Sequence, residues 1–516
     1  MSESAPASNS RQVPIALSIG ALFSLSFIAI PLIYLIRRAL ESDGRSISIL
    51  VWRPKTLEVL ITTLTLTAAV VVLATVIGVA MAWSLHSVKI PLPNLFRALV
   101  ILPIAIPSYV FTFSWISVFP QISGFWAAVF ILVLSTTPYV LLAALAGLRR
   151  VDWSQYEVAQ TLGLNNWESF LRVTWPQIRN SVAAGALLVA LYVLSDFGAV
   201  ALLGVDTFTR AISNLYRGSF DRSTAAVLAL ILVIISAIII SLETRLRTKT
   251  KLQRTSARII RLPNLISKTR TKLVSILLLV IYLATGLVFP LALLFYRFFA
   301  NAVQVDYSEL FSASISTIFA SALGALIALA LALPLGLLVM QGSWLARVAD
   351  KGVLIVHALP GIVMGLALVS FGSEISWLYQ SVGLLAFSYA LLYTAKSVGS
   401  VRTSLARVPQ NLIDISATLG QTKMQTLRRV VFPLAAPGVL SGSLLVFLSA
   451  MKELPATLML RPTGFETLAT EMWRYTSISR FSEAAPYALF LILIAAIPTF
   501  LINRPDRGES EEGDMR

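Results

Sequence analysis

The chain has 516 residues, of which 57% are hydrophobic and only 13% are charged. An average soluble protein carries about 25% charged residues, so this composition excludes an ordinary soluble protein and indicates a helical membrane protein. The basic residues behind the net charge of +16 concentrate in loops, which reflects membrane orientation better than nucleic-acid binding. The absence of cysteine excludes disulfides and thiolate metal sites within the chain.

Twelve apolar stretches are long enough to cross a hydrocarbon layer about 30 Å thick. The first follows a polar leader that ends at Arg11, is too long for a signal-peptide core, and is expected to be retained. The sequence therefore predicts an all-α polytopic membrane protein with about 12 transmembrane helices. In chain order the predicted spans are 13–36, 58–84, 95–118, 124–147, 178–204, 224–241, 273–299, 313–340, 352–371, 376–396, 434–460 and 485–502.

A strongly basic segment separates the first six spans from the last six. Residues 243–272 contain many Lys and Arg and a single acid, Glu243. The positive-inside rule places this linker in the cytoplasm, and six spans on either side place both termini there as well. The basic loop from Arg37 to Lys55 would lie outside and disagrees with this orientation. The predicted parts are 1–242 as a first six-span repeat, 243–272 as a cytoplasmic linker, and 273–516 as a second six-span repeat.

The two halves repeat each other at a spacing of 257 residues. An even number of spans in each half gives parallel repeats, so the matching polar loops would both face the cytoplasm. Two matched loops indicate a docking surface for a two-fold symmetric partner. The matched positions are Thr161-Leu162-Gly163 with Thr418-Leu419-Gly420, Arg172 with Arg429, Pro176 with Pro433, Gly185 with Gly442, and Asp196 with Glu453.

Each repeated loop is predicted to form a short helix, a sharp corner and a second short helix. In the first copy Glu157 suits the first helical turn, Gly163 suits the left-handed end of a helix, and Pro176 ends the loop. The second copy, from Asp414 to Pro433, repeats the plan. Such an elbow could insert an apolar face into a partner and transmit movement. The alternative is an amphipathic connector that rests on the lipid surface.

These loops resemble the EAA loop of binding-protein-dependent ABC transporter permeases, in which E-A-A is followed after three residues by G and later by P. The copies read Glu157-Val158-Ala159 before Gly163 and Asp414-Ile415-Ser416-Ala417 before Gly420, so the spacing is kept while several letters differ. The resemblance implies a type I ABC permease fold in which the loops form coupling helices that dock on an ATPase. The implied coupling residues are Glu157, Ala159, Gly163, Pro176, Asp414, Ala417, Gly420 and Pro433.

The tandem arrangement and the stretches Lys452–Pro462 and Gly464–Thr470 are similar to the iron(III) uptake branch of that family. This resemblance implies a permease subunit of an ATP-driven importer in the bacterial plasma membrane, which receives ferric iron from a periplasmic or extracellular binding protein and works by alternating access. Permeases for thiamine, polyamines, phosphonates and sulfate share the loop, so another small solute is an alternative. An ion-coupled secondary transporter is a further alternative.

The sequence carries no motif for covalent chemistry. No G-x-x-x-x-G-K-[ST] phosphate loop is present, so ATP with Mg²⁺ is expected on a separate ATPase, in two copies, and no cofactor on this chain. His86 and His357 lack metal-ligand spacing, and neither an enzyme active site nor nucleic-acid binding is expected.

Two acids and two prolines stand out within apolar sequence. A carboxylate in hydrocarbon is costly and usually faces a partner or a water-filled path. Asp196 and Glu453 could therefore line a pathway for ferric iron, a hard cation that prefers oxygen ligands. The alternative is structural: Asp196 caps a broken helix, and Glu453 pairs with Lys452 or Arg461. The prolines of Leu102-Pro103 and Leu359-Pro360 predict paired helix distortions.

Overall fold

The computed structural model describes residues 15–41, 44–219, 222–252, 268–300, 306–339 and 344–502, and within them the regular secondary structure is helical. The predicted leader, the ends of the chain and residues 253–267 of the predicted linker lie outside the described residues. The elements in chain order are α1 (Ile15–Leu40), α2 (Gly44–Val51), α3 (Pro54–Ser87), α4 (Pro93–Ile101), η1 (Leu102–Ala105), α5 (Ser108–Ile116), α6 (Gly124–Leu148), α7 (Trp153–Thr161), α8 (Asn166–Ser169), η2 (Phe170–Thr174), α9 (Trp175–Ser195), α10 (Gly198–Leu202), α11 (Phe208–Asn214), η3 (Leu215–Ser219), α12 (Arg222–Leu252), α13 (Thr269–Leu283), η4 (Ala284–Val288), α14 (Phe289–Ala300), α15 (Tyr307–Val339), α16 (Trp344–His357), α17 (Gly361–Gly372), α18 (Val382–Ala406), α19 (Gln410–Thr418), α20 (Lys423–Thr426), η5 (Leu427–Val431), α21 (Phe432–Met451), α22 (Pro455–Leu460), α23 (Leu468–Ser477) and α24 (Phe481–Ile502).

The predicted all-α polytopic class is confirmed, but not every predicted span is one straight helix. Among the described residues, nine helices are long and apolar enough to cross a membrane, and two bent helix pairs raise that number to eleven. The predicted span 178–204 ends early, because α9 stops at Ser195 and the short α10 follows. Likewise 434–460 is divided between α21 and α22. The last predicted span lies in α24, of which Phe481–Ala496 is a shorter apolar helix.

The two bent pairs lie at equivalent places in the two halves. The predicted span 95–118 bends by 91° between η1 and α5, and 352–371 bends by 104° between α16 and α17. Pro107 and Pro360 are the N-caps of α5 and α17 and have nearly identical backbone angles. The structural partner of Pro360 is therefore Pro107, whereas the predicted partner Pro103 lies inside the 3-10 turn η1.

Two compact units make up the chain, and each contains helices from both sequence halves. In the unit that holds most of the second half, the rings of Phe27 on α1 and Phe387 on α18 are 5.7 Å apart. In the unit that holds most of the first half, Tyr282 on α13 donates a 2.8 Å hydrogen bond to the carbonyl of Leu134 on α6. Each half thus contributes its first helix to the unit built around the other half. The predicted sequence boundaries at 242/243 and 272/273 stay a prediction.

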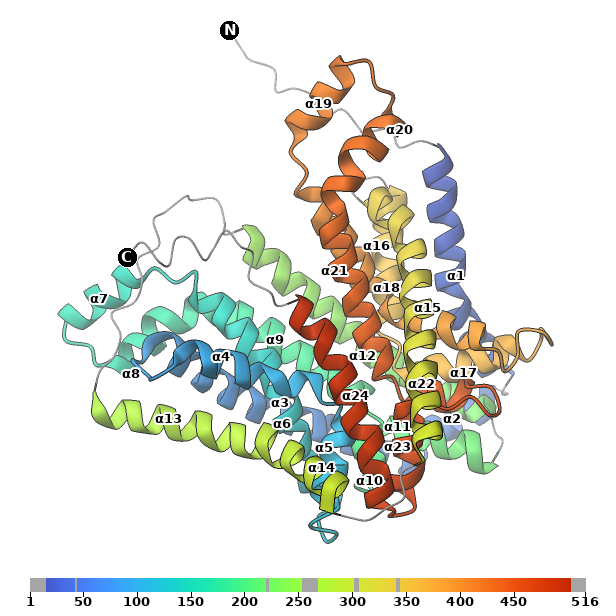
Figure 1. Ribbon diagram of the computed structural model, residues 1–516, viewed down its shortest axis with the longest axis horizontal. Helices are drawn as coiled ribbons and strands as arrows, with labels where there is room; N and C mark the ends of the chain where they lie inside the picture. Colours follow the sequence, from blue (N-terminus) through green and yellow to red (C-terminus); the bar gives the residue numbers. More distant parts are fainter. Residues whose placement is uncertain are drawn as a thin grey trace. The chain divides into compact units, whose positions relative to one another are not determined.

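A close helix crossing follows the elbow in each repeat. A Cβ at Gly185 on α9 would lie 2.7 Å from the Cβ of Ala143 on α6, and one at Gly442 on α21 would overlap Ser400 on α18. Within a membrane the hydrophobic effect does not drive helices together, so helix pairs depend on close packing, which small residues allow. Figure 1 shows α18 beside α21, the pair that makes the second crossing. The matched glycines of the sequence repeat therefore position the spans that carry the elbows.

Candidate functional site

The first elbow, Trp153–Pro176, has the predicted helix, corner and helix. Asp152 caps α7 by accepting a 3.2 Å hydrogen bond from the Ser154 amide. At the corner Gly163 has φ +89°, and the Leu164 amide donates to the carbonyl of Ala159 at 3.1 Å. This is the hydrogen-bond pattern of a Schellman helix end, in which glycine avoids the steric cost of the left-handed conformation. Asn165 and Glu168 then form a capping box at the start of α8.

The second elbow, Gln410–Pro433, repeats this backbone. Gly420 has φ +76°, and the Gln421 amide donates to the carbonyl of Ser416 at 3.1 Å. Thr422 and Gln425 exchange hydrogen bonds of 2.8 and 3.3 Å between amide and side chain, so they cap α20 as Asn165 and Glu168 cap α8. The predicted corner geometry is confirmed in both copies.

Both elbows expose apolar side chains at equivalent positions. Leu162 is 78% exposed and its counterpart Leu419 is 75% exposed. A patch of exposed apolar side chains on a rigid surface marks a site of interaction. The three matched exposed pairs are Val158 with Ile415, Leu162 with Leu419, and Trp167 with Met424.

The two elbows are supported from inside by different contacts. Beneath the first lies a cluster of aromatic rings, which we call the aromatic support: Trp83 on α3, with Trp153, Tyr156 and Phe170. Burial there raises the pKa of Tyr156. In the second elbow the positions equivalent to the three elbow aromatics hold Gln410, Ile413 and Leu427. Its interior is joined by a 2.8 Å hydrogen bond between the buried hydroxyls of Ser416 and Thr426.

The predicted coupling residues occupy different depths in the elbows. Ala159 is buried, Glu157 is half-buried, and Gly163 and Pro176 are exposed. In the second elbow Asp414 accepts a 3.1 Å hydrogen bond from Gln410, and Ala417, Gly420 and Pro433 are exposed. The buried equivalent of Ala159 is Ser416. The family motif points to Ala417 instead, whereas the 257-residue spacing of the repeat identifies Ser416.

Asp196 caps the helix that follows its span. The residue is 7% exposed. Its carboxylate accepts hydrogen bonds from the amides of Ala199 at 3.0 Å and Val200 at 3.3 Å, and another from the hydroxyl of Ser108. These contacts hold α10 in place at the end of α9. They match the structural alternative for this residue.

Glu453 has the equivalent place in the second repeat. Its carboxylate accepts a hydrogen bond from the amide of Ala456 at 3.3 Å, which caps α22, and another from the hydroxyl of Tyr393 at 2.7 Å. Its expected partner Arg461 instead forms an ion pair with Glu466.

The second repeat accommodates a longer acid by removing a side chain. Ser108 and Gly361 are both the first residues after the proline bend, on α5 and α17. Ser108 contacts Asp196 directly. At Gly361 a Cβ would overlap Glu453 Oε1 and lie 3.0 Å from Pro455. The contact between the acid and the start of the helix after the bend, which we call the acid junction, is therefore filled in two ways. The first repeat uses Asp196 with Ser108, and the second uses the longer Glu453 with Gly361.

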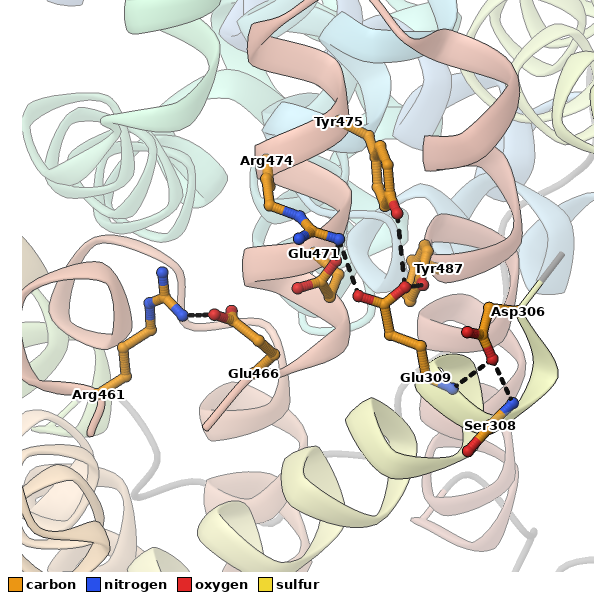
Figure 2. Close-up of polar contacts among 9 residues, drawn as sticks. All are labelled: Asp306, Ser308, Glu309, Arg461, Glu466, Glu471, Arg474, Tyr475 and Tyr487. Carbon is orange, nitrogen blue, oxygen red and sulfur yellow. Dashed lines mark hydrogen bonds and ion pairs between the residues drawn. The ribbon is translucent and has the colours of Figure 1, made fainter. Parts of the chain in front are cut away.

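A separate polar network, absent from the sequence predictions, fixes the start of α15. Figure 2 shows the carboxylate of Glu309 accepting hydrogen bonds from Arg474 and from the hydroxyl groups of Tyr475 and Tyr487. Arg474 also pairs with the buried Glu471, and Asp306 caps the helix through the amides of Ser308 and Glu309. These contacts join α15 to α23 and α24. Within the described residues, no group of three or more His, Cys, Asp or Glu side chains could hold a metal ion.

The fold and the elbows define a class of protein: a polytopic helical membrane protein with two equivalent halves, each of which exposes a rigid elbow. The family described as "binding-protein-dependent transport system inner membrane component" matches residues 74–252 and 328–504. The chain belongs to this family and is a transport permease that carries the family domain twice. Membership implies a substrate-binding protein and an ATPase as partners.

Curated relatives differ in what they are named for. The chain is 32% identical over 484 residues to the "Fe(3+)-transport system permease protein FbpB 2" of Haemophilus influenzae, covering 92% of this chain and 96% of that protein. It is 27% identical over 148 residues to a "putative 2-aminoethylphosphonate transport system permease protein PhnV" of Salmonella typhimurium, covering 28% and 56%. It is 25% identical over 217 residues to the "molybdate/tungstate transport system permease protein WtpB" of Thermococcus kodakarensis, covering 42% and 87%.

Proposed function

We propose that this chain is the permease subunit of an ATP-driven importer that takes ferric iron from a binding protein outside the membrane and releases it into the cytoplasm. The observation that supports iron as the substrate is the similarity to the Haemophilus influenzae permease over 92% of this chain. The other relatives compared align to 28% and 42% of it.

The elbows are the proposed points of coupling to the ATPase. Their backbones are fixed by capping boxes and glycine corners, and their exposed leucines offer an apolar surface. A rigid elbow transmits the movement of a bound partner to the span that follows it, because α8 and η2 lead directly into α9. Two elbows call for two copies of the ATPase, and we place both elbows and both chain ends in the cytoplasm of a bacterial cell.

Docking can be tested at Leu162 and Leu419. The pair Leu162→Glu with Leu419→Glu introduces charge into the apolar surface and is expected to abolish copurification of the ATPase. The control pair Leu162→Met with Leu419→Met keeps the surface apolar and should retain two ATPase copies for each permease chain. Full ATPase binding by a correctly inserted glutamate pair would contradict the docking role.

A separate hypothesis is that Asp196 and Glu453 line the iron pathway. Their capping contacts give both a structural task, so the test must separate the two roles. Asn and Gln keep the shape of the carboxylates and lose the charge. Unchanged iron uptake by inserted Asp196→Asn with Glu453→Gln would exclude a charged ligand role.

Substrate identity is tested by reconstitution. The permease, its ATPase and its binding protein are placed in liposomes, and uptake of radiolabelled iron is compared with uptake of molybdate and 2-aminoethylphosphonate. Iron uptake that requires ATP supports the proposal. Transport of one of the oxyanions without iron would instead support the second candidate, an importer for another small solute, which the names of the shorter relatives favour. Family membership gives no support to the ion-coupled alternative.

A further inference from the structure

A pocket lies beside the first turns of α9, directly after the first elbow. It has a volume of about 370 Å³, which is in the range of sites for small ligands. Its walls come from α3 and α9, which pack against each other within one compact unit. Among the lining residues are Thr75 on α3 and Trp175, Arg179, Asn180, Ala183 and Ala186 on α9.

The polarity of the pocket changes along α9. Its polar residues, Arg179 and Asn180, lie in the second turn of the helix. Ala186 lies seven residues beyond Arg179, which is about 10 Å deeper into the span, and the wall between them is formed by Val182 and Ala183. A polar end near the elbow and an apolar end within the span is the same order as the headgroup and acyl chains of a phospholipid.

The surface beside the pocket is also apolar. Val72 and Val76 lie one helical turn apart on α3, before and after Thr75, and are 59% and 63% exposed. Polar and ionisable side chains within spans face protein or a water-filled cavity, whereas exposed valines are compatible with hydrocarbon. This surface therefore suits the tails of a lipid better than it suits a water-filled path.

Arg179 is the cation at the polar end of the pocket. It is exposed, and among the described residues no acid forms an ion pair or a hydrogen bond with it. A guanidinium group offers five N–H donors in a planar fork that matches phosphate oxygens. The buried hydroxyl of Thr75 also has no hydrogen-bond partner within the described ranges, although buried polar groups are nearly always paired. The pocket thus has one uncompensated positive charge and one unsatisfied hydroxyl.

The second repeat shows that the fold does not need this cation. At the spacing of 257 residues, Arg179 and Asn180 correspond to Ala436 and Pro437 on α21. The elbow before these positions and the glycine crossing after them are present in both repeats. The connection from elbow to span is therefore built in the second repeat without a positive charge, and Arg179 is a feature of the first repeat alone.

We propose that this pocket binds an anionic phospholipid from the leaflet on the elbow side of the membrane, with its phosphate at Arg179 and an acyl chain along Ala183 and Ala186. Basic pockets between spanning helices bind anionic lipid headgroups. A zwitterionic headgroup fits less well, because it brings its own cation close to Arg179. The inference goes beyond transport and depends neither on the substrate nor on which side of the membrane the elbows face. It places a lipid beside the span that follows the first elbow.

The test counts the lipids that the full chain retains in detergent, by native mass spectrometry. Phosphatidylglycerol is the probe, and phosphatidylcholine with the same acyl chains is the reference. We expect the wild-type chain to prefer phosphatidylglycerol about tenfold, the order of one charge-assisted hydrogen bond. Arg179→Gln should abolish this preference and Arg179→Lys should keep most of it. The matched control Arg150→Gln, at an exposed arginine beside the elbow and outside the pocket, should keep all of it.

A preference for phosphatidylglycerol that Arg179→Gln leaves unchanged, or a wild-type chain without any preference, would overturn the site. The apolar end is tested by Ala183→Trp, which fills the pocket and leaves Arg179 in place, so loss of phosphatidylglycerol in this variant supports the lipid. Inorganic phosphate is the competing probe. Displacement of phosphatidylglycerol by an equal concentration of phosphate would assign the pocket to a free anion and overturn the lipid. Should Ala183→Trp fail to insert, Ala183→Leu gives the same comparison with a smaller side chain.

Discussion

The two elbows have the same backbone but different interiors. The first rests on the aromatic support of Trp83, Trp153, Tyr156 and Phe170, whereas the second is joined internally by the hydroxyls of Ser416 and Thr426. The glycine corner, the capping box and the exposed leucines are common to both. The corner and the exposed surface are therefore the shared requirement, while the interior adapts to the helices around it.

The largest expected difference is at the foot of the first elbow. Trp153 is 3% exposed, and its counterpart Gln410 is exposed. Trp153→Ala should destabilise the first elbow by about 3–5 kcal/mol, the usual cost of removing a buried aromatic side chain, while Gln410→Ala should leave the second nearly unchanged. Hydrogen exchange of 153–176 and 410–433 measures both. Equal protection of the first elbow in wild type and Trp153→Ala would show that the aromatic support is dispensable.

The glycine corners should be equally sensitive in the two elbows. Gly163→Val or Gly420→Val forces a branched residue to a left-handed φ, which costs about 1–2 kcal/mol, so the corner should shift and coupled transport should fall. The matched control is Gly204→Val, with φ +75° and no atom within 4 Å of its Cβ position, outside the elbows. Transport per hydrolysed ATP is the measurement. Equal loss in the control would assign the effect to backbone strain alone.

The acid junction of the second repeat can be converted by substitution into that of the first. Gly361→Ser introduces a side chain where Glu453 lies, and overpacking of this kind costs about 1–3 kcal/mol. Adding Glu453→Asp recreates the Ser108 and Asp196 pair of the first repeat and should restore part of the lost stability. Thermal unfolding of the two single variants and the double variant in detergent gives the coupling energy. Additive effects would show that the two junctions are not interchangeable.

The smallest expected effect concerns the buried hydroxyls of the elbows. Ser416→Ala leaves the Thr426 hydroxyl buried without its partner, at a cost of about 1 kcal/mol. In the first elbow, Ser169 Oγ is buried and has no hydrogen-bond partner among the described residues, so Ala159→Ser should be neutral or slightly stabilising. Exchange rates of the elbow amides would reveal either change. A destabilising Ala159→Ser would mean that the first elbow has no room for the hydroxyl.

Much of the local structure could be predicted from the sequence, because it depends on neighbouring residues. Gly163 and Gly420 mark helix ends through backbone sterics, and their spacing from the acids identified the family loop. The polar residues Tyr389, Tyr393 and Lys396 recur at helical spacing within an apolar span, so a polar face on α18 could also be predicted from the sequence.

The sequence by itself determined the membrane class, the tandem repeat and the two glycine corners, since apolar length, periodicity and steric freedom are properties of short segments. Tertiary structure alone decided that Pro107 rather than Pro103 matches Pro360, that the first helix of each half packs in the unit of the other, and that Glu453 fits against Gly361. These facts depend on which distant side chains share a limited space, and that is set only when the helices pack.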